Sequence, residues 1–367
     1  MKRTLLAAAP LAGMALLLAF SRTALTAAKT AVTVFFTGVL PALLPFYVLS
    51  SLLLSSGALA ALSARVRSRV LPCWALGAAA GFPVGARLCD RAGQADRAAL
   101  CNLCSPAFLL GVVAQELCGN VQLFFPLAIA HYGSGLLLLS VLAAFRGRKA
   151  GVAANASVEA EASAPAPAGL FPAISDGMHA MLRILGCMVF FSVASAVGNA
   201  ALRLDRAPGA AAAVSAFFEI TAGCRAAALL PLPSRALAAL LAAAVSFGGL
   251  CVLAQAKLLA PAMPVKPYLL QKLLQAALSA LLAYWITPYF VPEQLSVFSD
   301  CAERYAGNAL LGGAYLYTGF TALSAVWLTM ECIKKARSRA PGRTVRRTER
   351  RAINNRPLRP RHRRHPR

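Results

Sequence analysis

The chain has 367 residues, of which 59% are apolar and 14% are charged, and its mean hydropathy is +0.64. Because soluble domains are roughly 45–50% apolar and about 25% charged, this composition excludes a soluble enzyme. The net charge is +24, which in a soluble protein would indicate nucleic-acid binding. The positions of the basic residues therefore decide what this charge means.

Residues 1–29 contain the first apolar run, 4–20, directly after Lys2 and Arg3. A basic start followed by an apolar stretch and small residues fits a secretory signal peptide as well as a membrane anchor. We favour an uncleaved signal-anchor helix over a cleaved signal. A cleaved signal would leave the rest of the topology unchanged.

Further apolar runs follow, each close to the ~20 residues that a helix needs to cross a bilayer. They predict an all-α polytopic membrane protein with about eight transmembrane helices. Two other runs, 72–86 and 211–224, are short and interrupted, so we expect them to be poor continuous spans. The expected spans are 4–20, 35–56, 99–118, 121–143, 183–203, 236–256, 268–290 and 311–332.

Basic residues between the runs indicate the orientation, because Lys and Arg are enriched in cytoplasmic loops. If every run crosses the membrane, the basic loops fall on opposite sides and contradict this rule. The contradiction disappears if 72–86 and 211–224 are re-entrant, which puts both termini in the cytoplasm and the acidic loop 291–308 outside. The residues assigned to the cytoplasm are Arg65, Arg67, Arg69, Arg146, Arg148, Lys149, Lys257, Lys266, Lys272 and the basic tail.

This topology gives two halves with the same order of parts in opposite directions, an inverted repeat. Inverted repeats with broken helices are a recurrent plan of secondary transporters. The expected domains are the N-terminal helix and loop 1–29, a first membrane repeat 30–145, an Ala- and Pro-rich cytoplasmic connector 146–169, a second membrane repeat 170–333 and a basic tail 334–367.

The tail holds 15 basic residues against one acid, Glu349, and has little apolar content. This composition is typical of a disordered segment. We expect a topogenic signal that contacts anionic lipids, and we disfavour nucleic acid as a partner. The sequence leaves a homo-oligomer open.

The candidate site lies where the helices are expected to break, because irregular backbone at membrane depth is tolerated where it lines a cavity. Glycine allows close backbone approach and proline releases carbonyl groups from the helix. The candidate substrate-binding residues are Gly81, Phe82, Pro83, Gly85, Arg87, Asn102 and Ser105 in the first half, and Glu219, Thr221, Gly223, Arg225, Ser246, Gly248, Gly249 and Gln255 in the second.

Charges within the apolar regions are few, and each costs about 3 kcal/mol at the bilayer centre unless it is paired or faces water. The main candidates are Arg87, Arg183 and Arg225, beside the acid Glu219. This excess of arginine favours an anionic solute, because guanidinium binds carboxylate in a two-pronged geometry. We expect Arg87 and Arg225 to hold substrate carboxylates. The alternative is that Glu219 pairs structurally with an arginine while the others extend to the membrane surface.

Other reactive residues give weaker signals. His131 lies in an apolar span, where it would relay protons or bind substrate, or pack as a structural residue. Cys101 and Cys104 form a single C-x-x-C motif without a second pair, which favours buried thiols over a zinc or redox site. We find no phosphate-binding loop and no nucleophile with a base. We therefore expect no enzymatic activity, no cofactor and no metal.

Several uncommon motifs occur in order along about residues 30–332. They are Val39-Leu40-Pro41-Ala42-Leu43-Leu44-Pro45-Phe46, Gly81-Phe82-Pro83-Val84-Gly85-Ala86, Asn102 with Ser105-Pro106, His131-Tyr132, Glu219-Ile220-Thr221-Ala222-Gly223 and Ser246-Phe247-Gly248-Gly249-Leu250. In these motifs the chain resembles the sporulation integral membrane proteins of the YlbJ type, within the larger group that carries the nucleoside-recognition or gate domain. The tail and the connector lie outside the resemblance.

The resemblance implies a role in endospore formation, in which the family is linked to moving dipicolinic acid from the mother cell across the outer forespore membrane. Dipicolinate is a rigid aromatic dicarboxylate, which suits paired guanidinium groups and an aromatic side chain such as Phe82 or Phe247. Two alternatives remain open. One is a membrane scaffold for spore-envelope assembly that docks through its tail, and the other is a nucleoside-type carrier in which Glu219 contacts a ribose or base.

Overall fold

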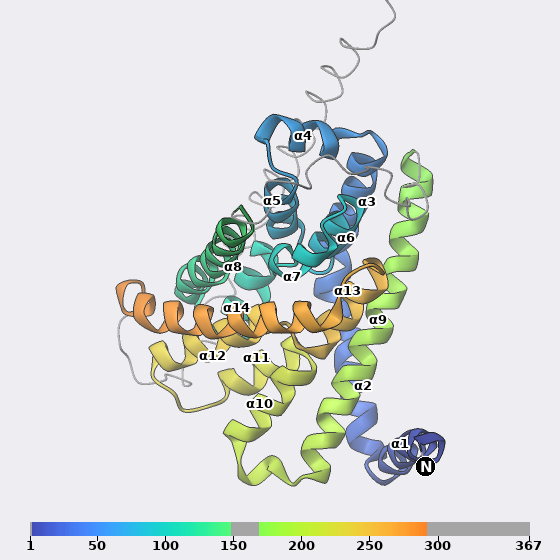
Figure 1. The fold of residues 1–367 in the computed structure, drawn as a ribbon. Coiled ribbons are helices and arrows are strands. Elements are labelled where there is room, and N and C mark those ends of the chain that lie inside the picture. Colours follow the sequence, from blue (N-terminus) through green and yellow to red (C-terminus); the bar gives the residue numbers. More distant parts are fainter. Residues whose placement is uncertain (1, 148–168, 292–367) are drawn as a thin grey trace, which may run out of the picture.

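A computed structural model describes residues 2–147 and 169–291, which form helices joined by turns, with no β-strand in either range (Figure 1). The first half contains α1 (Lys2–Ala19), α2 (Ser21–Val34), η1 (Phe35–Val39), α3 (Leu40–Ser55), α4 (Ala58–Val66), α5 (Val70–Ala80), α6 (Val84–Arg91), η2 (Ala95–Arg97), α7 (Ala98–Cys101), η3 (Phe108–Leu117), η4 (Val121–Leu123) and α8 (Phe124–Gly147). The second half contains α9 (Leu170–Ala201), η5 (Leu204–Arg206), α10 (Pro208–Phe218), α11 (Ile220–Ala228), α12 (Ser234–Phe247), α13 (Gly249–Leu259), α14 (Val265–Ile286) and η6 (Thr287–Tyr289).

Two long helices run antiparallel and side by side along one edge of the molecule (Figure 1). One is the continuous 35-residue helix formed by α2, η1 and α3, and the other is the 32-residue helix α9. At 1.5 Å per residue each is roughly 50 Å long, which exceeds the ~30 Å hydrocarbon core of a bilayer. Each helix is therefore long enough to cross a membrane with a tilt or to extend beyond it.

Both segments expected to be re-entrant form hairpins of short helices. α5 and α6 turn back on each other at Gly81–Pro83, and Gly77 packs against Gly85 with the Cys101 carbonyl between them. A Cβ at either glycine would collide with that carbonyl oxygen. In the second half α10 and α11 turn at Glu219, where Gly223 packs directly on the backbone of Ala216. The close contacts in both hairpins require residues without side chains.

A second break follows each hairpin. In the second half α12 ends and α13 begins at Gly248 and Gly249, which have φ angles of +80° and +73°. Glycine adopts such positive φ angles without strain. A Cβ at Gly249 would lie 2.9 Å from the Phe218 carbonyl oxygen, so this break also rests directly on the α10–α11 hairpin. The two halves thus share the order of long helix, hairpin, broken helix and long helix.

The break in the first half corrects one expected span. Residues 99–118 do not form one helix, because α7 ends at Cys101 and the π-helix η3 begins at Phe108. Asn102 leaves the helical conformation with φ −86° and ψ +87°, and its carbonyl oxygen accepts a hydrogen bond from Lys272 instead of from the backbone. The helical conformation resumes at Pro106, whose missing N–H group is not needed in the first turn of a helix.

In the view of Figure 1, α14 crosses between the short helices α4–α7 above it and α10–α12 below it. Its buried face carries Lys272, Gln275 and Ser279, whereas its exposed face includes Leu270 and Leu273. Polar residues inside and leucines outside are the reverse of the pattern in a water-soluble helix. A lipid environment around the exposed face accounts for this pattern.

The prediction of an all-α polytopic membrane protein is confirmed. Five helices in the described ranges are long and apolar enough to cross a membrane. The total of about eight spans stays a prediction, because 311–332 lies outside the described residues, as do the connector and the tail. The five helices are Ser21–Ser55, Val121–Ala144, Leu170–Ala201, Ser234–Leu259 and Val265–Tyr289.

Candidate functional site

A cavity of about 260 Å³ lies between α2, α9 and the α10–α11 hairpin. Three of the residues predicted from the sequence, Glu219, Thr221 and Arg225, line it together. Opposite them are Thr30 of α2 and a polar stripe on α9, whose spacing of three and four residues places it on one helix face. The stripe consists of Ser192, Ser195 and Asn199.

The charges of this cavity differ in how they are held. Glu219 is buried, and its two carboxylate oxygens accept hydrogen bonds from the backbone N–H groups of Thr221, at 2.9 Å, and Ala222, at 2.7 Å. It therefore caps α11, and the expected alternative of an ion pair with an arginine is not the contact observed. Arg225, by contrast, is exposed and lines the cavity.

Neutral hydrogen-bonding groups complete the cavity wall. The amide nitrogen of Asn199 donates to the Ser215 hydroxyl at 2.9 Å and so joins α9 to α10. The side-chain Oδ1 of Asn199 is buried without a hydrogen-bond partner among the described residues. This oxygen is an acceptor, so the groups of the wall that can donate to an anion include the Arg225 guanidinium and the hydroxyls of Thr30, Ser192 and Ser195.

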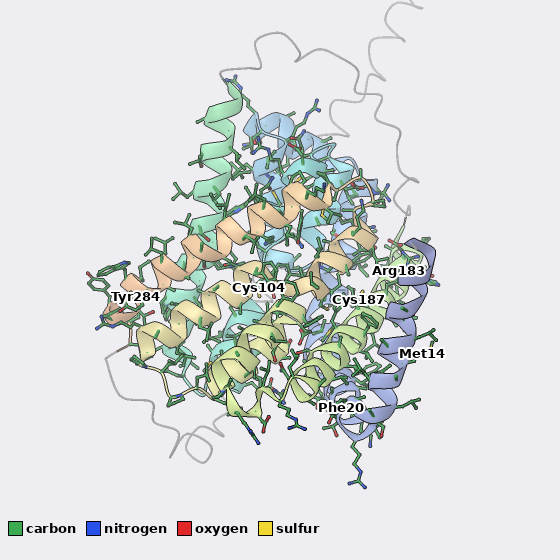
Figure 2. All side chains as sticks on the ribbon, turned by 60° about the horizontal axis from the view of Figure 1, so that its bottom comes forward. Met14, Phe20, Cys104, Arg183, Cys187 and Tyr284 are labelled. Carbon is green, nitrogen blue, oxygen red and sulfur yellow. The ribbon has the colours of Figure 1, made fainter. Side chains whose placement is uncertain are left out.

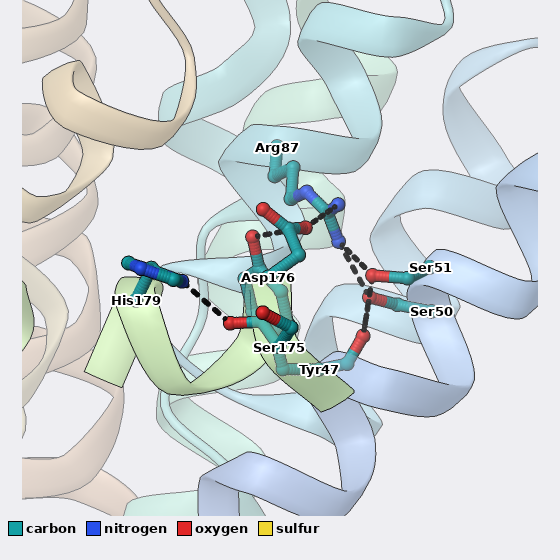
Figure 3. Close-up of polar contacts among 7 residues, drawn as sticks. All are labelled: Tyr47, Ser50, Ser51, Arg87, Ser175, Asp176 and His179. Carbon is teal, nitrogen blue, oxygen red and sulfur yellow. Dashed lines mark hydrogen bonds and ion pairs between the residues drawn. The ribbon is translucent and has the colours of Figure 1, made fainter. Parts of the chain in front are cut away.

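Arg87 occupies a closed polar cluster in the first half (Figure 3). Its guanidinium group is 4% exposed and donates to the Asp176 carboxylate at 2.9 Å and to the Ser51 hydroxyl at 2.8 Å. Tyr47 donates to the same carboxylate at 3.1 Å, and its ring lies 4.2 Å from the guanidinium carbon. The expected substrate carboxylate is thus replaced here by a carboxylate of the chain itself.

Arg87 and Arg225 hold corresponding places in the two hairpins. Each follows by two residues the glycine that packs on the opposite arm of its hairpin, Gly85 and Gly223. Arg87 reaches serines of α3 and an acid of α9, whereas Arg225 lines the cavity together with serines of α9 and Thr30 of α2. The acid in the cavity lining is Glu219, whose carboxylate oxygens accept hydrogen bonds from the start of α11. One guanidinium is therefore neutralised within the protein, and the other faces a cavity.

A second polar cluster lies at the centre of the molecule, near Cys104 (Figure 2). His131 is fully buried, accepts a hydrogen bond from the Cys104 N–H at 3.0 Å and contacts the Ser246 hydroxyl at 2.8 Å. The first contact requires an unprotonated Nε2, so Nδ1 carries the proton and donates to Ser246. This geometry is that of a neutral, packed histidine.

Lys272 lies in the same cluster, which corrects its assignment to a cytoplasmic loop. It is fully buried on α14 and donates to the carbonyl oxygen of Asn102 at 2.6 Å and to Gln275 Oε1 at 3.0 Å. The ring of Phe82 lies 5.4 Å from its ammonium nitrogen. The loop assignment failed because Lys272 sits near the start of its span, where an exposed lysine and a buried one give the same sequence signal.

The site expected from the sequence is thus divided between two places. Phe82, Asn102 and Ser246 meet at the central cluster, and Glu219, Thr221 and Arg225 meet at the cavity. Ser105 lies against Gly81, and Gln255 donates to the Cys251 sulfur at 3.1 Å. Arg183 is exposed at the periphery (Figure 2). The contributing residues that sequence reasoning missed are Thr30, Tyr47, Ser50, Ser51, Asp176, Ser192, Ser195, Asn199, Ser215, Tyr268, Lys272 and Gln275.

The break between α12 and α13 joins these two places. Ser246 contacts His131 in the central cluster. Three residues later, the Cα of Gly249 lies so close to the hairpin that a Cβ there would be 3.1 Å from the Glu219 backbone nitrogen. A movement of this short segment would therefore displace both the Ser246 contact with His131 and the backbone of Glu219 beside the cavity.

Comparison with curated proteins shows that the chain is similar to the sporulation integral membrane protein YlbJ of Bacillus subtilis (strain 168). The two are 28% identical over 174 residues, which cover 42% of this chain and 40% of that protein. This chain thus spans about 40% of the length of the curated relative that it matches. The similarity supports the resemblance inferred from the motifs. No family model matches the chain, and no solved structure matches it.

Proposed function

We propose that this integral membrane protein is a sporulation-associated transporter that moves a small aromatic dicarboxylate of the dipicolinate type across the outer forespore membrane. The observation that carries the proposal is the cavity that Arg225 lines together with neutral polar groups of α2 and α9. The sporulation context rests on the similarity to a sporulation integral membrane protein.

The chemistry of the cavity favours a compact anion. Its volume of about 260 Å³ is just below the roughly 300–1,000 Å³ of sites for drug-sized ligands. Arg225 would bind one carboxylate in the two-pronged geometry of guanidinium. Ser192, Ser195 and Thr30 would donate hydrogen bonds that orient the rest of the solute. Both oxygens of Glu219 already bond to the backbone, which disfavours the alternative in which it binds a nucleoside.

The corresponding place of Arg87 suggests how the transporter would alternate. In the first half, Arg87 is buried and pairs with Asp176 of α9. In the second half, Arg225 lines an open cavity. Opposing movements of the two hairpins against the long helices would open one arginine as the other closes. Both termini would lie in the cytoplasm, with the basic tail on anionic lipids, and no enzymatic step or cofactor is required.

The test is uptake of labelled dipicolinate into proteoliposomes that contain the purified protein. Arg225→Gln should abolish most of the uptake, whereas Arg206→Gln, at an exposed arginine in η5, should leave it unchanged. Uptake by the parent protein no greater than in protein-free vesicles would end the proposal. Competition by uridine but not by other dicarboxylates would favour a nucleoside carrier instead.

A further inference from the structure

Lys272 has an unusual environment for a charged residue. Its side chain is fully buried, and its ammonium contacts within the described ranges are two neutral oxygens and the face of the Phe82 ring. A buried ammonium without an anion is strongly disfavoured relative to a neutral amine. Ionisable residues inside membrane proteins that lack a structural counter-ion are by default functional.

The elements packed against α14 do not supply the missing anion. They are α7, α8, α12, α13, η2 and η6, and the acid among their residues is Asp96 of η2, which pairs with Arg97. Their other titratable groups are Arg97, Cys101, His131, Tyr132, Arg146, Arg235, Cys251, Lys257 and Tyr289, with Cys104 after α7 and Tyr268, Tyr284 and Lys266 on α14 itself.

The nearest of these groups are not free to take a proton in place of Lys272. His131 uses Nε2 to accept the Cys104 N–H and Nδ1 to donate to Ser246. Tyr268 accepts a hydrogen bond from the side-chain nitrogen of Asn102 at 2.8 Å. Lys272 is therefore the group of this cluster that can change charge while its neighbours keep their hydrogen bonds.

Hydrogen bonds connect Lys272 to the segment that touches the cavity. Gln275 accepts from Lys272 through its oxygen and donates to the His131 carbonyl oxygen through its nitrogen at 3.2 Å. His131 contacts Ser246, which precedes the Gly248–Gly249 break packed against the hairpin of Glu219. A change of charge at Lys272 thus acts on the break that both sites share.

We propose that Lys272 is the proton-binding site that couples proton movement to passage of the anion. The amine nitrogen takes a proton from water on one side of the membrane by forming one N–H bond, and the same bond breaks when the proton returns to water on the other side. Protonation changes the hydrogen bonds of Lys272 with Asn102 and Gln275. These bonds connect through His131 and Ser246 to the break beside the cavity, so proton binding and solute binding are linked. This inference rests on the transport function proposed above.

The test measures two activities of proteoliposomes separately. One is exchange of labelled for unlabelled dipicolinate, and the other is accumulation of dipicolinate driven by a pH gradient. Membrane potential is held at zero with valinomycin and equal K⁺ on both sides. For one proton per solute, an interior about one pH unit more alkaline should drive roughly tenfold accumulation of labelled dipicolinate by the parent protein. Lys272→Gln should retain exchange of labelled for unlabelled dipicolinate and lose this accumulation. Lys266→Gln, an exposed position on the same helix, should retain both.

The outcomes distinguish the two proposals. Gradient-driven accumulation by Lys272→Gln equal to that of the parent overturns the role of Lys272 and leaves transport intact. Absence of exchange by the parent overturns the transport function and the coupling together. If Lys272→Gln does not fold, the parent protein is tested with pyranine trapped inside the vesicles. Acidification that accompanies dipicolinate entry supports coupling, and entry without acidification overturns it.

Discussion

Arg87 of α6 donates to Asp176 of α9 at 2.9 Å, which ties the hairpin of the first half to the long helix of the second. The arginine is almost completely buried, while the Asp176 side chain is 40% exposed. Tyr47, Ser50 and Ser51 of α3 complete the contacts. The Arg87–Asp176 pair therefore fills the position in the first half that corresponds to the Arg225 cavity in the second half.

Removing the acid of this pair should destabilise the protein. Asp176→Ala leaves a buried guanidinium without its anion, a change that costs about 3–5 kcal/mol for fully buried pairs. Because Asp176 is partly exposed, we expect roughly 2 kcal/mol, measured as a lower melting temperature in detergent. The control is Asp205→Ala at an exposed position in η5. Equal melting temperatures for the two variants would contradict a stabilising role for the pair.

Glu219 should act through the helix cap rather than through solute contact. Glu219→Ala leaves the N–H groups of Thr221 and Ala222 without their acceptors, which costs about 1–3 kcal/mol. Glu219→Gln keeps one acceptor oxygen and should lose less stability. Hydrogen exchange at these two amides measures the effect. Unchanged exchange in Glu219→Ala would show that the side chain does not cap α11.

Because glycines of both hairpins lie directly against backbone atoms, alanine at these positions should prevent correct folding, whereas alanine at an uncrowded glycine should not. Gly85→Ala would drive a methyl group into the Cys101 carbonyl, and Gly223→Ala into the Ala216 backbone. Both variants should fail to give a monodisperse protein in size-exclusion chromatography. Gly186→Ala is the matched control, because a Cβ there meets nothing within 4 Å. Normal folding of Gly85→Ala would argue against the α5–α6 packing.

Deleting residues 338–367 separates transport from scaffolding. A transporter should retain its flux in proteoliposomes, because the cavity and the central cluster lie outside the tail. A scaffold that docks through the tail should instead lose spore-envelope assembly in cells. Loss of flux on deletion, with normal folding, would show that the tail takes part in transport.

The breaks were predictable because their causes are local. Glycine and proline at 81–83 and the pair Gly248–Gly249 interrupt a helix through their own backbone properties. Asn102 is a candidate at such a break, although the expected span 99–118 runs through it. The hairpin at Glu219 follows from a carboxylate that can cap the next helix. These signals lie within a few residues of the feature, so they required no knowledge of distant contacts.

The partners at the breaks were not predictable in the same way. Asp176 precedes the span expected at 183–203, so the rule for charges inside membranes did not consider it, and Lys272 was assigned to a loop by the positive-inside rule. The α9 stripe had a usable signal in Ser192, Ser195 and Asn199, whose spacing places them on one face. Small polar residues are also common at ordinary helix contacts in membranes, so only the fold shows that this stripe faces a cavity.

The most direct measurement of the central claim is equilibrium binding of labelled dipicolinate to the purified protein in detergent. Loss of the charged hydrogen bonds of Arg225 is worth about 1.5–3 kcal/mol, so Arg225→Gln should weaken binding roughly 10- to 100-fold. Arg206→Gln should bind as the parent does. Equal affinity of the parent and Arg225→Gln, or no saturable binding by the parent, would contradict the account.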